Sequence, residues 1–223
     1  MRSKGTMDIA EFKKQPVLGI LRGAELEQIE PLIETVVSAG LRTLEITMNT
    51  PDAAQLIQKA RKIAQGRLVL GAGTVLGIDS LKSAIDAGAT FIVMPVLVQE
   101  VVKYCVDRKI PVFPGALTAE EIYNAWQAGA TMVKVFPVKF FGPEYFREIK
   151  GPFNQIELLA CSGVTAQNMR EYFTCGASAV SFGASVFKKE WLQNKDYSSI
   201  AGAIKAYVRQ LPFELTKGAG GVE

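Results

Sequence analysis

One lysine stands inside an otherwise apolar run that is typical of a buried β-strand. The run "ATMVKVFP" covers residues 130–137, and Lys134 lies in it between Val133 and Val135. Burial disfavours the ammonium form of a lysine and so favours the neutral amine. A neutral amine can attack a ketone and form a Schiff base, which makes this lysine a candidate for covalent catalysis. The alternative is that its head group simply extends into water, as in most lysines with apolar neighbours.

A carboxylate lies in a second run of the same kind. Glu45 belongs to "RTLEIT", residues 42–47, and strand alternation places it on the face opposite Leu44 and Ile46. The same alternation separates Lys134 from the valines on either side of it. Whether the acid and the amine meet depends on the fold that holds the two strands.

Short β-branched runs alternate with helical stretches along the chain. After a helix at residues 7–14, the sequence predicts strands at residues 17–21, 42–47, 68–71, 91–94, 110–113, 131–136, 156–160 and 179–182. The helices that follow them are predicted at residues 25–39, 51–65, 79–87, 99–108, 119–128, 143–150, 166–174 and 197–210. Repeated strand–helix pairs predict an α/β fold with a parallel sheet, and their number favours a single (β/α)8 TIM barrel. A doubly wound open sheet is the alternative.

Local signals agree with these boundaries. Thr118 and Glu121 have the spacing of a helix capping box. Similar segments place a glycine just after a helix and just before a strand, and the glycines are Gly40, Gly88, Gly129 and Gly176. Each is expected to end its helix with a positive φ. We expect one barrel domain over residues 1–223, with disordered tails at 1–6 and 216–223.

In a barrel, the outer side of each strand packs on helices and is aliphatic. The aliphatic faces of the two runs therefore turn outward, and Glu45 and Lys134 point into the barrel from its second and sixth strands. A catalytic role is favoured, because a buried ion pair is often no better for stability than apolar residues. A purely structural salt bridge is the alternative.

Composition excludes several kinds of partner and chemistry. A net charge of +3 gives no argument for nucleic acid or membrane, and no apolar signal segment or membrane-spanning run is found. The three cysteines, Cys105, Cys161 and Cys175, lack metal spacing and are expected to be free thiols in the cytoplasm. The chain has no histidine, so proton transfer must use carboxylates, lysine, tyrosine or water. We expect no metal and no cofactor.

Polar and small residues follow the strands directly, at the end where barrel active sites lie. Candidate substrate-binding residues after the first four strands are Arg22, Asn49, Thr74 and Pro95. Small residues after the last two strands would let a phosphate approach backbone N–H groups, and they are Ser162, Gly163, Gly183, Ala184 and Ser185. Tight turns also need such glycines, so a structural role for "GAGT" and "FGAS" is the alternative.

The motifs "LEITMNTP", "GAGTVL", "VKVFP", "FGP-Y", "GVT--N" and "FGAS" occur in this order. Together they resemble the class I 2-keto-3-deoxy-6-phosphogluconate aldolases, some of which act on 4-hydroxy-2-oxoglutarate. The resemblance covers about residues 8–210, and "ILRG", "MNTP" and "FGPEY" are closer to the 6-phosphogalactonate branch. It implies a (β/α)8 barrel, a homotrimer, Lys134 as the Schiff-base lysine and Glu45 as the acid–base residue. It also implies substrate-binding roles for Thr74, Pro95 and Phe136 and a phosphate-binding role for Ser185.

This chain departs from the family pattern at two places. Asn49 stands where the phosphogluconate branch has arginine, and the similar branch implies that Arg22 holds the substrate carboxylate instead. Cys161 and Ser162 replace the usual threonine or valine followed by glycine, which leaves sugar-phosphate specificity open.

The residues and the resemblance together predict a lyase that acts on a small 2-keto acid. The substrate is a 2-keto-3-deoxy sugar acid, expected to be 6-phosphorylated, or 4-hydroxy-2-oxoglutarate, and the products are pyruvate and an aldehyde. One alternative is a barrel that binds a phosphorylated ligand without covalent chemistry. Another is a sugar-phosphate isomerase or epimerase that uses Glu45 as its base and leaves Lys134 idle.

Overall fold

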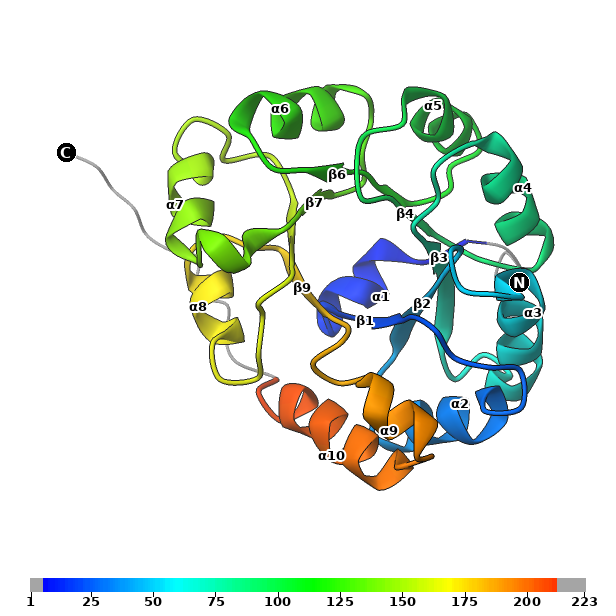
Figure 1. Ribbon diagram of the computed structural model, residues 1–223. Coiled ribbons are helices and arrows are strands. Elements are labelled where there is room, and N and C mark those ends of the chain that lie inside the picture. The colour runs from blue at the N-terminus through cyan, green and yellow to red at the C-terminus, as the bar shows by residue number, and fades with distance from the viewer. Residues whose placement is uncertain (1–5, 212–223) are drawn as a thin grey trace.

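A computed structural model describes residues 6–211 of the chain. Its strands form one sheet in which every neighbouring pair is parallel, and helices surround that sheet (Figure 1). The strands are β1 (Val17–Leu21), β2 (Thr43–Thr47), β3 (Val69–Gly73), β4 (Ile92–Val93), β5 (Val112–Phe113), β6 (Gly115–Ala116), β7 (Val133–Val135), β8 (Leu158–Cys161) and β9 (Ala179–Phe182). Around the sheet their order is β5-β4-β3-β2-β1-β9-β8-β7-β6.

The elements β5 and β6 are two halves of one barrel strand, separated only by Pro114. The first half pairs with β4 and the second with β7. Across the break, the Phe113 carbonyl accepts a hydrogen bond from the Met94 N–H at 3.0 Å, and the Pro114 carbonyl accepts one from the Lys134 N–H at 2.9 Å. The ring therefore continues through the proline, which confirms the predicted TIM barrel. The doubly wound alternative is wrong.

The helices occupy the predicted stretches but are shorter at several ends. They are α1 (Ile9–Lys14), α2 (Ile29–Ser38), α3 (Ala53–Ala64), α4 (Ile78–Asp86), α5 (Gln99–Asp107), α6 (Ala119–Gln127), α7 (Glu144–Lys150), α8 (Met169–Thr174), α9 (Lys189–Gln193) and α10 (Tyr197–Val208). Helix α9 and a 3₁₀ turn, η1 (Val138–Phe140), were not predicted. Both are too short to show a hydrophobic period in the sequence.

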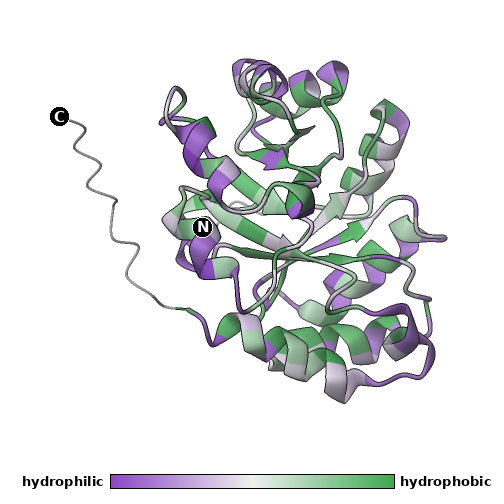
Figure 2. Cartoon of the chain, turned by 60° about the vertical axis from the view of Figure 1, so that its left-hand side comes forward, coloured by the Kyte–Doolittle hydropathy of each residue, from purple (hydrophilic) through white to green (hydrophobic). Residues whose placement is uncertain are grey.

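Two apolar layers hold the barrel together. Outward-facing strand residues, such as Leu44 and Val133, pack in one cluster with the inner faces of the surrounding helices. Apolar residues then face the sheet, and polar ones face outward (Figure 2). Inside the barrel, Met132 and Phe113 pack with Phe12 of α1, which closes the far end of the ring in Figure 1. The opposite end of the ring is left for polar groups.

The local predictions are also confirmed where the structure tests them. Thr118 and Glu121 form a reciprocal capping box at the start of α6. The four predicted helix-ending glycines all have positive φ, at Gly40, Gly88, Gly129 and Gly176. Of the predicted tails, residues 1–5 and 216–223 lie outside the described residues. Within residues 6–211, no helix is long and apolar enough to cross a membrane.

Candidate active site

Lys134 lies at the centre of β7 and points into the barrel, as predicted. Its neighbours Val133 and Val135 face the helices, whereas Met132 belongs to the inner cluster. The residue is 6% exposed, and its Nζ lies 5.4 Å from the centroid of the Phe136 ring. The amine is therefore buried inside the barrel, beside an aromatic ring.

Glu45 lies inside the barrel on β2 and is 1% exposed. Neither of its carboxylate oxygens has a hydrogen-bond partner among residues 6–211, which is rare for a buried polar group. Burial raises the pKa of this carboxyl, and the charges of Lys134 and Arg22 partly offset the effect. A carboxyl with a raised pKa accepts a proton more readily than an ordinary carboxylate, which suits a group that takes up and returns a proton.

The acid and the amine face one interior space without forming a direct ion pair. No hydrogen bond from Lys134 reaches Glu45, because both carboxylate oxygens are unpartnered. The two groups still interact electrostatically, since the lysine charge lowers the pKa of the carboxyl. A structural salt bridge does not describe this arrangement. The acid and the amine are instead two buried, separate polar groups that interact through their charges.

Three predicted substrate-binding residues form one cluster at the barrel mouth. The Arg22 Nη1 donates to Oδ1 of Asn49 at 2.9 Å, and its Nη2 donates to Oγ1 of Thr74 at 3.2 Å. Thr74 follows β3 with a φ of 55°, in the left-handed region. The loop after β1 is tied to the loop after β2 because the Gly23 N–H donates to Oγ1 of Thr50 at 3.0 Å. The guanidinium is thus held at a fixed place above the acid.

Pro95 and Phe136 line one pocket of about 310 Å³ at the rim of the barrel. Gly115, which pairs with Lys134 across the sheet, also lines it. A Cβ at Gly115 would lie 2.0 Å from the Pro95 carbonyl oxygen, so only glycine permits this approach. A larger cavity of about 620 Å³ lies beside α1 at the other end of the barrel, and none of the predicted site residues lines it.

The loop after β8 contains two predicted phosphate-binding residues in unusual conformations. Ser162 and Gly163 follow one another with φ values of 79° and 80°. Asn168 holds the loop, because its Nδ2 donates to the Gly163 carbonyl at 3.0 Å and its Oδ1 accepts from the Thr165 N–H at 2.7 Å. These hydrogen bonds give the turn a defined shape.

The loop after β9 contains the other three predicted phosphate-binding residues, Gly183, Ala184 and Ser185. The Gly183 carbonyl accepts hydrogen bonds from the N–H groups of Val186 and Phe187, at 2.9 and 2.8 Å. Ala184 and Ser185 are exposed, and their own N–H groups donate to none of the residues described. Because β8 and β9 are adjacent strands, this loop and the loop after β8 leave the sheet side by side. The N–H groups of Ala184 and Ser185 are therefore available as donors beside the loop after β8.

Tyr207 on α10 joins these two loops, although no local pattern in the sequence singles it out. Its hydroxyl donates to the Val164 carbonyl at 2.9 Å and lies 3.4 Å from the Ser185 Oγ. Burial raises the pKa of this phenol, so it remains a neutral donor. A tyrosine far along the chain, in an ordinary amphipathic helix, carries no local signal for such a role.

Comparisons with known proteins agree with this geometry. A family model described as "Aldolase: KDPG and KHG aldolase" matches residues 9–203. The 2-dehydro-3-deoxy-6-phosphogalactonate aldolase of Escherichia coli is 30% identical over 195 residues, covering 87% of this chain and 95% of that protein.

Two solved structures superpose over most of the chain. One is described as a native KDPGal structure, with a TM-score of 0.81, 29% identity, and coverage of 87% of this chain and 93% of the other. The second is the KDPG aldolase of Legionella pneumophila with pyruvate captured as a covalent carbinolamine intermediate. It has a TM-score of 0.81 and 26% identity, and covers 89% of this chain and 96% of the other.

Proposed function

Because the chain belongs to the KDPG and KHG aldolase family, and is thus a carbon–carbon lyase that releases pyruvate, we propose that Lys134 is its Schiff-base residue. The observation that carries this proposal is the placement of one enclosed amine opposite one buried, unpartnered carboxylate, Glu45. The neutral amine attacks the C2 ketone of a 2-keto-4-hydroxy acid and forms a carbinolamine. Loss of water then gives an iminium ion, which withdraws electrons from the adjacent bond.

Glu45 carries the proton through the rest of the reaction. As a carboxylate it takes the proton from the C4 hydroxyl, directly or through a water molecule. The C3–C4 bond breaks, an aldehyde leaves, and the electron pair remains as an enamine on Lys134. Glu45 returns its proton to C3, which restores the iminium ion. Hydrolysis then frees pyruvate and the amine, and no external cofactor takes part.

The mouth cluster orients the keto acid. Arg22 is the only group among the predicted site residues at this end with a fixed positive charge, and it offers a fork of N–H donors to a carboxylate. Asn49 and Thr74 hold that fork in position. Pro95 and Phe136 form the apolar wall beside the amine. The substrate would therefore lie with its carboxylate toward Arg22 and its C2 toward Lys134.

The substrate class follows from the loops after β8 and β9. A 6-phosphate is expected to accept hydrogen bonds from free N–H and hydroxyl donors there, supplied by Ser162, Gly163, Gly183, Ala184 and Ser185. We therefore propose a 6-phosphorylated 2-keto-3-deoxy sugar acid as the substrate, with 4-hydroxy-2-oxoglutarate as a smaller alternative. Neither the ligand-binding barrel nor the isomerase is favoured by a specific observation.

A homotrimer in the cytoplasm is the proposed state of the protein. Large apolar side chains are exposed at the mouth rim, with Phe140 72% and Leu76 57% exposed, and such patches often mark interfaces. Free cysteines, all three of them buried, suit a reducing compartment. Sedimentation analysis of the wild type and of a Phe140→Ser variant tests the assembly. A monomeric wild type would contradict the trimer.

The decisive test of the chemistry is trapping with pyruvate and borohydride, followed by peptide mapping. We expect one reduced adduct, on Lys134, and none in Lys134→Met. Lys150→Met is the matched control, because burial lowers the pKa of Lys150, whereas this lysine lies on α7, away from the barrel interior. An adduct on Lys139 or Lys150 would overturn the assignment, and no adduct would overturn the aldolase mechanism.

A further inference from the structure

A lysine that the proposed mechanism does not use lies against the phosphate loop after β8. Lys139 belongs to the turn η1, which follows the strand of the Schiff-base lysine. A Cβ at Gly163 would lie 2.6 Å from the Lys139 Cβ and 2.7 Å from its Cα. The two residues therefore touch through their backbones, and the absence of a side chain at Gly163 is what permits the contact.

The groups expected to hold the phosphate are all neutral. They offer N–H and hydroxyl donors, whereas a phosphate monoester carries close to two negative charges at pH 7. A site of neutral donors binds such a group better when a cation stands beside it. Lys139 supplies a positive charge directly at the edge of this loop.

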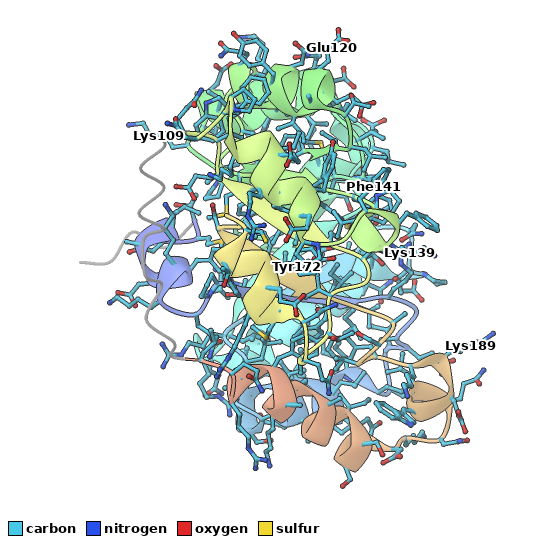
Figure 3. All side chains as sticks on the ribbon, turned by 90° about the vertical axis from the view of Figure 1, so that its left-hand side faces the viewer. Lys109, Glu120, Lys139, Phe141, Tyr172 and Lys189 are labelled. Atoms are coloured by element: carbon cyan, nitrogen blue, oxygen red, sulfur yellow. The ribbon has the colours of Figure 1, made fainter. Side chains whose placement is uncertain are left out.

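The charge of Lys139 is not used elsewhere. Its side chain is exposed and forms no ion pair with any residue in the described part of the chain. Its Nζ lies 4.7 Å from the centroid of the adjacent Phe140 ring, a contact that a phosphate can readily replace. In Figure 3, Lys139 and Phe141 lie on the side of the molecule opposite Lys109, at the mouth of the barrel.

Other cations at the mouth are placed for different contacts. Arg22 is held by Asn49 and Thr74 near the acid, at the keto-acid end of the proposed substrate. Lys188, beyond the loop after β9, holds its Nζ 4.2 Å from the ring centroid of Trp191. Of these three cations, Lys139 is the one whose backbone contacts Gly163 of the phosphate loop.

We propose that Lys139 binds the distal phosphate of the substrate and gives the enzyme its preference for a phosphorylated 2-keto-3-deoxy sugar acid over the same acid without phosphate. This inference rests on the proposed function, because it assumes that the loops after β8 and β9 receive the phosphate. It assigns Lys139 a role in substrate binding and no role in bond cleavage.

The test compares Lys139→Gln, Lys139→Arg and the control Lys189→Gln, which removes an exposed lysine from the same side of the molecule. For Lys139→Gln we expect KM for the phosphorylated acid to rise about tenfold with kcat nearly unchanged, since a charged hydrogen bond is lost. Kinetics with the unphosphorylated acid should stay the same. Competitive inhibition by inorganic phosphate should weaken by a similar factor. Lys139→Arg should bring both the KM for the phosphorylated acid and the inhibition by phosphate most of the way back to wild-type values.

An equal rise in KM and an equal weakening of phosphate inhibition in Lys189→Gln would mean that only the net charge of this face matters. That result would overturn the inference. An unchanged KM in Lys139→Gln would do so as well. Pyruvate–borohydride trapping is measured on every variant and separates the two proposals. Normal trapping with an unchanged KM rejects the role of Lys139 alone, whereas absence of trapping in the wild type rejects the aldolase mechanism.

Discussion

The carboxylate of Glu45 occupies the space that a side chain at Gly73 would fill. A Cβ at Gly73 would lie 2.2 Å from Oε1 and 2.6 Å from Cδ of the acid. The two residues are on adjacent strands, β2 and β3, and both positions face the barrel interior. No residue in the described part of the chain forms a hydrogen bond with this carboxylate, so the shape of the recess is what fixes its position.

Gly73→Ala is therefore expected to move the acid while leaving the lysine in place. A displacement of about 1 Å at a reacting group can cost about 100-fold in rate, and we expect a loss of that order in kcat. Pyruvate–borohydride trapping on Lys134 should persist. Gly77→Ala is the control, because a Cβ there meets nothing within 4 Å. Unchanged turnover in Gly73→Ala would show that Glu45 does not need this recess.

Glu45→Gln should separate imine formation from bond cleavage. The amide keeps the size of the side chain but cannot accept the C4 proton, so turnover should fall by about 100-fold to 10,000-fold. Lys134 should still trap pyruvate in the presence of borohydride. Turnover is measured through pyruvate release from the sugar acid. Wild-type turnover in this variant would remove Glu45 from the mechanism.

The stability of the protein should reveal the raised pKa of Glu45. Its carboxyl titrates above the ordinary value of 4.5 in the folded protein, so folding favours the protonated form. The resulting stabilisation is complete at low pH and is lost as the pH rises through the folded-state pKa. The free energy of unfolding of the wild type relative to Glu45→Gln should therefore fall with increasing pH above 4.5. The free energies of unfolding of the two proteins are measured with urea. A difference between them that stays constant from pH 5 to pH 8 would contradict this prediction.

Arg22 should set the acid limb of the pH–rate profile. Its charge lowers the pKa of Glu45, against the larger effect of burial. In Arg22→Gln that opposing effect is lost, so the pKa of Glu45 rises further and activity should disappear at a higher pH on the acid side. Arg22→Lys should keep the limb near its wild-type position. The measurement is kcat against pH at saturating substrate. A downward shift in Arg22→Gln would be inconsistent with Glu45 acting as the base.

Tyr207→Phe should loosen the two phosphate loops without touching the reacting atoms. The hydroxyl that bonds to the Val164 carbonyl and lies beside Ser185 is removed, at a cost of about 1 kcal/mol. KM for the phosphorylated acid should rise about fivefold, and kcat should change little. The unphosphorylated acid serves as the internal control. An equal effect on both substrates would point to general destabilisation of the barrel.

The strand–helix repeat and the alternation within each strand were sufficient to predict the barrel and the inward direction of its polar residues. Period-2 patterning decides which face of a strand meets the helices, and this placed both Lys134 and Glu45 inside. Small turn residues after the strands predicted which end of the barrel holds the site. These are local properties of the chain, and each can be read within a few residues.

Relations between distant segments depended on the tertiary structure. The recess at Gly73, the Tyr207 bridge and the contact of Lys139 with Gly163 each join residues from different strand–helix units. No sequence period connects such pairs, because their distances depend on how the side chains of neighbouring strands share the interior. The sequence by itself determined that an amine and an acid point inward. Only the folded barrel decided that they stay unpaired and that the carboxylate lies against Gly73 of β3, because these contacts depend on how neighbouring strands share the interior.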